Sequence, residues 1–303
     1  MPPTYKDKIG YLPYAESLQF SNGGVYPLEN FNSISQYVNK RTNEDGFYYP
    51  PTIQTHRQRH ELIDGTLETF EELVPNTKRP ANLFKMPPSH EIQIIKPVNA
   101  NDPRKGDGLF ITYLVAFIFG VRLQFYDWWF DGRVPVNSQQ DFCFMPLPTE
   151  KFIDSAYYIW RNSSDLEKKL ITNLLYMQTK VKSYEWAWER FSISYMILDG
   201  CYKLLNESYG VVSRRHGDRI KTVLKHFNMK LDMDWITHIV RLRNELFHET
   251  LWEGGQPGNS GSTYSYSATL HLSMLNNRLI FAILGHRGEY IYSPWWLKST
   301  FAF

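Results

Sequence analysis

The placement of proline constrains the fold of this chain more than any other feature. Fifteen of its 17 prolines lie in the first 148 residues, and none occurs between Pro148 and Pro257. Proline breaks a helix because it lacks the backbone N–H and clashes with the preceding turn. Long helices are therefore favoured after residue 148, and short strands before it. We predict an α+β chain of two domains, a mixed, strand-containing domain over 1–148 and an all-α helical bundle over 149–303.

In the second half, apolar residues recur at helical spacing. The expected helices lie over 149–161, 164–181, 184–207, 214–228, 233–252 and 264–285. Two groups of residues are typical N-caps, Ser163-Ser164-Asp165 before the second helix and Asp232/Asp234 before the fifth. We expect Gly254-Gly255 to end the fifth helix.

In the first half, the segments 91–98 and 122–126 are predicted strands. The run over 109–121 is continuously apolar, so it has no period that separates a buried strand from a buried helix, and both remain open. The aromatic-rich segment 126–133 is predicted either to pack in the core or to line a pocket for an unknown trigger ligand. The first domain is therefore a candidate sensor.

Composition excludes several classes of protein. With 43% hydrophobic and 21% charged residues, the chain is an ordinary globular protein rather than a disordered or collagenous one. Its longest apolar run is shorter than the roughly 20 residues of a membrane span, and its N-terminus lacks a signal peptide, so we expect a cytoplasmic location and no membrane contact. Cys143 and Cys201 are isolated, which argues against a disulfide or zinc site.

Positive charge is concentrated in the helical half. The whole chain has a net charge of only +2, yet about 19 basic residues face about 15 acidic ones after residue 148. The densest cluster, over 214–230, is either a solvated helix face or a stripe that contacts phosphates. In the second interpretation, RNA-binding residues would be Arg214, Arg215, Arg219, Lys221, Lys225 and Arg241.

A helical wheel of 235–251 separates an apolar face from a polar one. The apolar face consists of Trp235, Ile236, Ile239, Val240, Leu242, Leu246 and Phe247, and the polar face of Arg241, Asn244, Glu245 and His248. Asn244 and His248 are one turn apart, at i and i+4, so we expect a direct hydrogen bond between them. Such a bond would set the orientation of His248.

Arg243 falls inside the apolar arc, between Val240 and Phe247, where a guanidinium needs a partner. A buried ion pair with Asp199 or Glu189 is one interpretation. The other is that this edge of the helix faces a groove or a partner subunit, where the arginine binds an anion.

The segment Arg243-Asn244-Glu245-Leu246-Phe247-His248 resembles the motif of the HEPN superfamily, in which Arg, a polar residue, three arbitrary residues and His lie on a late helix of a helical bundle. The resemblance covers roughly 149–290. It is strongest to the ApeA-like branch, associated with abortive infection in bacterial phage defence, and the tail His286-Arg287-Gly288-Glu289-Tyr290 adds to it.

The resemblance implies a metal-independent endoribonuclease that acts as a homodimer, with two motifs meeting across a cleft. Arg243, Asn244 and His248 would be the catalytic residues, needing no cofactor. His248 would take the proton of the 2′-OH, Arg243 would stabilise the phosphorane and Asn244 would orient His248. The products would carry a 2′,3′-cyclic phosphate and a 5′-OH.

The residue two positions after His248 bears on how the activity would be controlled. HEPN toxins controlled by nucleotidyltransferase partners commonly carry Tyr two positions after the His, whereas this chain has Thr250, so we expect control by the first domain.

His56 and His60 have the spacing of a helical zinc pair without further ligands, which favours an exposed basic loop or helix and no metal. The alternative function is a non-catalytic HEPN-like module that binds RNA or a protein.

Overall fold

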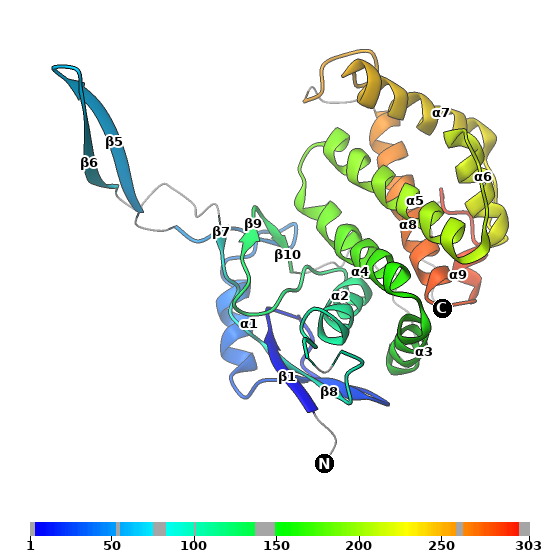
Figure 1. Cartoon of the computed structure of the whole chain (residues 1–303), viewed down its shortest axis with the longest axis horizontal. Helices are drawn as coiled ribbons and strands as arrows, with labels where there is room; N and C mark the ends of the chain where they lie inside the picture. The colour runs from blue at the N-terminus through cyan, green and yellow to red at the C-terminus, as the bar shows by residue number, and fades with distance from the viewer. Residues whose placement is uncertain are drawn as a thin grey trace.

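The computed structural model describes residues 4–52, 55–74, 83–99, 101–136, 149–258 and 263–296. Strands and two helices precede residue 137, and after Thr149 the described chain is helical (Figure 1). The expected mixed architecture with a helical C-terminal part is therefore confirmed. The predicted boundary at residue 148 and Cys143 lie outside the described residues.

A small antiparallel sheet in the order β1-β8-β3-β2 forms one layer of the N-terminal part. Its strands are β1 (Thr4–Ile9), β2 (Leu18–Phe20), β3 (Gly23–Pro27) and β8 (His90–Ile95). Alternate residues of β8 are buried, as expected for a sheet with one face on the core. The strand predicted over 91–98 is thus confirmed, although it ends at Ile95.

Further strands are short. Two pairs, β4 (Phe47–Tyr48) with β10 (Val134–Pro135) and β7 (Leu83–Phe84) with β9 (Phe130–Asp131), lie beside α1 (Phe31–Asn39). The hairpin of β5 (Thr55–Ile63) and β6 (Thr66–Val74) projects away from the rest of the chain (Figure 1). The loop or helix expected around His56 and His60 is therefore wrong. In a strand, residues four apart are separated by about 13 Å.

The ambiguous apolar run forms helix α2 (Asp107–Phe119), of which eleven of 13 residues are buried. A helix surrounded by protein needs no polar face, so its sequence shows no helical period. Gly108 lets α2 approach the sheet, since a Cβ there would lie 2.7 Å from the Tyr5 ring. Gly120, in the left-handed conformation, ends the helix.

The strand predicted over 122–126 is wrong, because its backbone bonds are divided between two neighbours. Arg122 N–H donates to Pro135, whereas Gln124 and Tyr126 bond to residues at the end of β1. Only Phe125 forms a bridge, with Ile9. No continuous ladder can form from such a pattern.

All six predicted helices are present in the C-terminal part. They are α3 (Thr149–Asn162), α4 (Asp165–Lys180), α5 (Ala187–Tyr209), α6 (His216–His226), α7 (Met233–Asn244) and α8 (Thr263–Ile283), with a 3₁₀ turn η2 (Val181–Ser183) and a short α9 (Glu289–Tyr292). Ser164 forms a capping box with Glu167, and Asp232 accepts a hydrogen bond from Trp235 N–H. Both predicted N-caps are therefore confirmed.

The fifth predicted helix ends differently. After α7 the chain forms one π turn, η3 (Glu245–Glu249), and Thr250 then adopts the left-handed conformation at φ 57°. The predicted stop at Gly254-Gly255 is thus wrong. Helical hydrogen bonding stops at Thr250 instead, five residues after Glu245, whose carbonyl accepts the Thr250 N–H.

One apolar core joins the two parts of the chain. Phe110 of α2 stacks on Trp160 of α3 with ring centroids 4.8 Å apart, and Phe117 contacts Phe281 of α8 at the same distance. The same cluster includes Ile9 from the sheet and Leu242 from α7. The division of the chain into two domains at residue 148 stays a prediction.

A buried carboxylate fixes the start of α2. Asp107 is fully buried, accepts the Val98 N–H at 2.9 Å and accepts a hydrogen bond from the Tyr157 hydroxyl of α3. Burial and this bond raise the pKa of Tyr157, so the phenol remains a donor. The pair connects the N-terminal part to the bundle.

Replacing Tyr157 by Phe should lower the free energy of unfolding by about 1–3 kcal/mol, because a buried carboxylate loses a hydrogen bond. Urea denaturation measures the change. Tyr158→Phe is the matched control, because Tyr158 is the next residue in the chain and its own side chain is 71% exposed. Equal stability of the two variants would contradict the importance of the Asp107–Tyr157 bond.

Candidate active site

The π turn after α7 decides which motif residues meet. Residues five apart in an α-helix lie about 140° apart around its axis, so their side chains diverge. A π turn closes its hydrogen bond over five residues and places such a pair on one side. Arg243 and His248, five residues apart, are brought together in this way.

The resulting contact is direct. Arg243 Nη1 donates to His248 Nε2 at 2.5 Å and to Asn244 Oδ1 at 3.1 Å. Asn244 and His248 are both exposed, whereas Arg243 is half-buried. The predicted contact between Asn244 and His248 is therefore replaced by a bridge through Arg243, because the π turn shifts the register by one residue.

This contact specifies the protonation of His248. An arginine has only donors, so the imidazole Nε2 must present its lone pair and the proton must be on Nδ1. In this geometry Nε2 of His248 is the acceptor and is covered by Arg243. A group that withdrew the guanidinium would uncover it.

Neither of the carboxylates expected to neutralise Arg243 does so. Asp199 lies 3.4 Å from Arg219 Nη1, and Glu189 accepts the Trp186 N–H at the start of α5. The guanidinium instead lies 5.5 Å from the Phe247 ring, and within the described residues its buried Nε has no hydrogen-bond partner. Phe247, expected in the apolar face, is 43% exposed because of the π turn.

Residues of α5 and α6 complete the site. His216 Nδ1 shares a hydrogen bond of 3.1 Å with the Tyr195 hydroxyl and lies 3.9 Å from Asp199 Oδ1. The Tyr195 ring contacts the Phe247 ring edge-on, with centroids 6.3 Å apart. A second histidine, a tyrosine and an aspartate therefore lie beside the Arg243–His248 pair.

Electrostatics favours the neutral form of His216. Partial burial and the charge of Arg243 lower its pKa, and Asp199 opposes them. Sequence reasoning missed this residue as part of the site, because 27 positions separate it from Arg243. The only available signal was its place in the basic cluster, at the first residue of α6.

The structure does not gather the predicted RNA-binding residues on one face. Arg219 donates to Ser213 and pairs with Asp199, whereas Lys221, about 160° away around α6, pairs with Asp218 at 3.5 Å. Arg241 pairs with Glu245. The remaining three, Arg214, Arg215 and Lys225, are exposed. Their role in RNA binding stays a prediction.

With this geometry established, the chain was compared with known proteins. It matches no family model, no curated protein and no solved structure. Functional inference therefore depends on the site itself.

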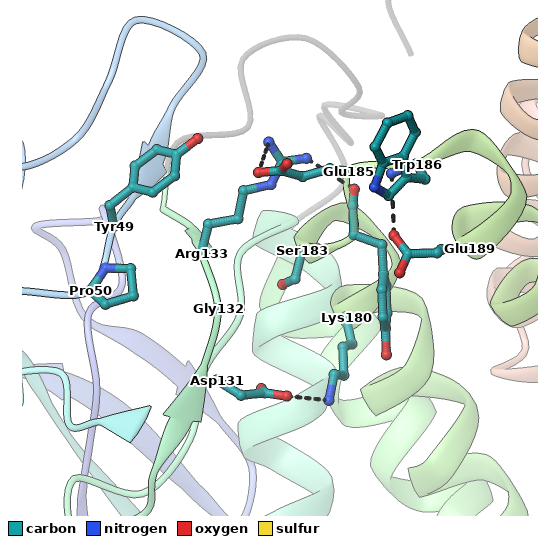
Figure 2. Close-up of a pocket in the computed structure, with 11 residues that line it drawn as sticks. Tyr49, Pro50, Asp131, Gly132, Arg133, Lys180, Ser183, Glu185, Trp186 and Glu189 are labelled. Carbon is teal, nitrogen blue, oxygen red and sulfur yellow. Dashed lines mark hydrogen bonds and ion pairs between the residues drawn. The ribbon is translucent and has the colours of Figure 1, made fainter. Parts of the chain in front are cut away.

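A second feature is a cleft of about 420 Å³ where both parts of the chain meet (Figure 2). Tyr49 and Pro50 lie on one side of it, and Trp186 and Glu189 on the other. The remaining lining residues are Asp131, Gly132, Arg133, Lys180, Ser183, Tyr184 and Glu185. The aromatic residues of the segment 126–133 do not line this cleft. Phe130 is buried in the core and Trp128 packs against the core, which is the first of the two expected roles, whereas Asp131, Gly132 and Arg133 line the cleft.

Ion pairs connect the walls of this cleft. Lys180 Nζ lies 3.0 Å from Asp131, which also accepts a hydrogen bond from the buried Arg122, and Arg133 pairs with Glu185 at 3.5 Å. Burial raises the pKa of Asp131, but the bonds from Arg122 and Lys180 outweigh it and lower the pKa to about 2. The contribution of Asp131 to stability is therefore present above its ordinary pKa and lost as the pH falls towards 2.

Within the described residues, no helix combines the length and apolar character needed to cross a membrane. No three His, Cys, Asp or Glu side chains of the same part of the chain are arranged to hold a metal ion.

The contact between Arg243 and His248 predicts an unusual tautomer. In the wild-type protein near pH 8, ¹⁵N chemical shifts of His248 should show the proton on Nδ1, because Nε2 accepts from Arg243. In Arg243→Met the proton should move towards Nε2. Arg241→Met is the control, since Arg241 lies about 160° away on the same helix. A wild-type His248 protonated on Nε2 would contradict the geometry.

Proposed function

We propose that this protein is a metal-independent endoribonuclease that leaves 2′,3′-cyclic phosphate and 5′-OH ends. The observation that carries the proposal is the exposed Arg243–His248 pair on a π turn, with Asn244 on the same guanidinium. RNA cleavage without metal needs a base that is neutral near pH 7 and a fixed positive charge at the phosphate. The resemblance to HEPN ribonucleases supports the same chemistry.

The resting contact suggests how RNA would start the reaction. A phosphodiester is a stronger attractor for a guanidinium than a neutral imidazole is, because both partners are charged. Binding RNA would draw Arg243 to a non-bridging oxygen and uncover His248 Nε2. The freed nitrogen would then accept the proton of the attacking 2′-OH, and Asn244 would position Arg243 rather than His248.

The alternative is a non-catalytic module that binds RNA or a protein. A structural ion pair of Arg243 with Asp199 or Glu189 would favour it, and the described residues contain neither pair. The contact between Arg243 and His248 at an exposed surface favours the enzyme. Action in the cytoplasm, in bacterial phage defence or as a toxin, is part of the proposal through the HEPN resemblance.

The trigger expected for the first 148 residues stays a prediction. The cleft of Figure 2 is a described surface where such a ligand would touch both parts of the chain. Helix α5 begins there, after its N-cap Trp186, and continues to Tyr195 and Asp199 at the site.

Wild-type protein should cleave total RNA or tRNA in EDTA, leaving cyclic-phosphate and 5′-hydroxyl ends. His248→Ala should reduce the rate by about 10²–10⁴-fold, the usual range for a proton-transfer group. His226→Ala is the control, because that exposed histidine packs on Tyr209. A folded His248→Ala protein that cleaves at the wild-type rate would refute the role of His248.

The homodimer is also part of the proposal. Phe247 is an exposed apolar residue beside the motif, as expected where a second copy packs. Sedimentation of the wild type should therefore give twice the 35.8 kDa of one chain. Phe247→Asp should shift the mass towards one chain, whereas Tyr158→Asp on the distant α3 should not. A monomeric wild type would contradict dimerisation.

A further inference from the structure

The first residue of α6 faces the motif from the other side. His216 is linked to it through two rings, since its Nδ1 bonds to the Tyr195 hydroxyl and Tyr195 packs on Phe247. Phe247 in turn contacts the Arg243 guanidinium. The charge of Arg243, and that of His248 when it is protonated, both lower the pKa of His216, which places the two histidines in one electrostatic neighbourhood.

We propose that His216 is the second proton-transfer residue of the site and donates the proton to the 5′-oxygen that leaves. This inference depends on the proposed ribonuclease function. The Arg243–His248 pair would supply a base and a positive charge but no proton for the leaving 5′-oxygen. His216 would supply that proton.

The proton balance requires such a residue. The 2′-oxygen forms a bond to phosphorus while its proton passes to His248, and the bond from phosphorus to the 5′-oxygen breaks. An alkoxide is a poor leaving group, so the 5′-oxygen needs a proton as the bond breaks. After the reaction His248 carries the extra proton and His216 lacks one, and exchange with water restores both.

Three other described histidines are unsuitable. His90 is buried in the sheet, where its Nε2 bonds to the Tyr14 carbonyl. His226 lies at the opposite end of α6, and His238 contacts Arg241 on the far side of α7. His216 is part-exposed, with 25% of its side chain accessible, so RNA can reach it.

The groups around His216 determine when it is a donor. Tyr195 and Asp199 face it from α5, Arg219 from its own helix, Arg243 from the end of α7 and His248 from the π turn η3. Burial and Arg243 lower the pKa of His216 from its ordinary value, so the free enzyme loses the donor as the pH rises through this lowered pKa. Asp199 stabilises the protonated form, as an anionic RNA phosphate would.

The deciding experiment replaces the leaving oxygen by sulfur. An oligonucleotide containing the site that the wild type cuts best is prepared with a 5′-bridging sulfur at that bond. A thiol has a pKa of about 8.5, so the thiolate leaves without a proton donor. Wild type, His216→Ala, His216→Gln, His248→Ala and the control His226→Ala are compared on both substrates, with folding checked by circular dichroism.

We expect both His216 variants to lose about 10²-fold or more in kcat/KM on ordinary RNA and to regain most of it on the sulfur substrate. His248→Ala should be slow on both, and His226→Ala should match the wild type. In wild type, kcat/KM on ordinary RNA should fall as the pH rises through the lowered pKa of His216. On the sulfur substrate this decline should be absent.

Two outcomes would overturn the inference in distinguishable ways. If the wild type cleaves RNA and folded His216 variants are either unimpaired or equally slow on both substrates, His216 is not the acid, while the ribonuclease proposal survives. If the wild type cleaves no RNA under any condition, the ribonuclease proposal and the role of His216 fail together.

Discussion

Burial of α2 is the constraint on which the rest of the structure depends. This helix has almost no polar surface, so it must be covered on every side. The sheet covers it from one direction, through Tyr5 against Gly108, and α3, α4 and α8 cover it from others. A single core therefore spans chain segments that differ in composition, and Asp107 sets the start of α2 through its bonds to Val98 and Tyr157.

The candidate site depends on a local departure from regular helix. The α7 face towards the core is regular, with Ile239 and Leu242 fully buried. One π turn then rotates the following residues, so that Phe247 is partly released from the core and His248 lies over Arg243. Such turns are rare and occur frequently at functional sites, which supports the proposal made for this one.

Sequence reasoning was accurate where local physics decides. Capping residues and helical periodicity located Ser164 and Asp232 and the six helices of the bundle. It was wrong where backbone partners come from distant segments. The segment 122–126 has the side chains of a strand, yet its hydrogen bonds go to two different neighbours, and nothing in five residues of sequence encodes that division.

The segment 243–248 shows the same division between what the local sequence predicts and what tertiary packing decides. The sequence alone determined that Arg243, Asn244 and His248 share a helix end and that Arg243 is unusual for its position. Only the tertiary structure decided that Arg243 bridges the other two, that Asp199 pairs with Arg219, and that His216 joins the site. The physical reason is the distance along the sequence between residues that interact. Helix identity follows from residues three or four apart, whereas side-chain partners depend on how helices far apart in the chain pack against one core.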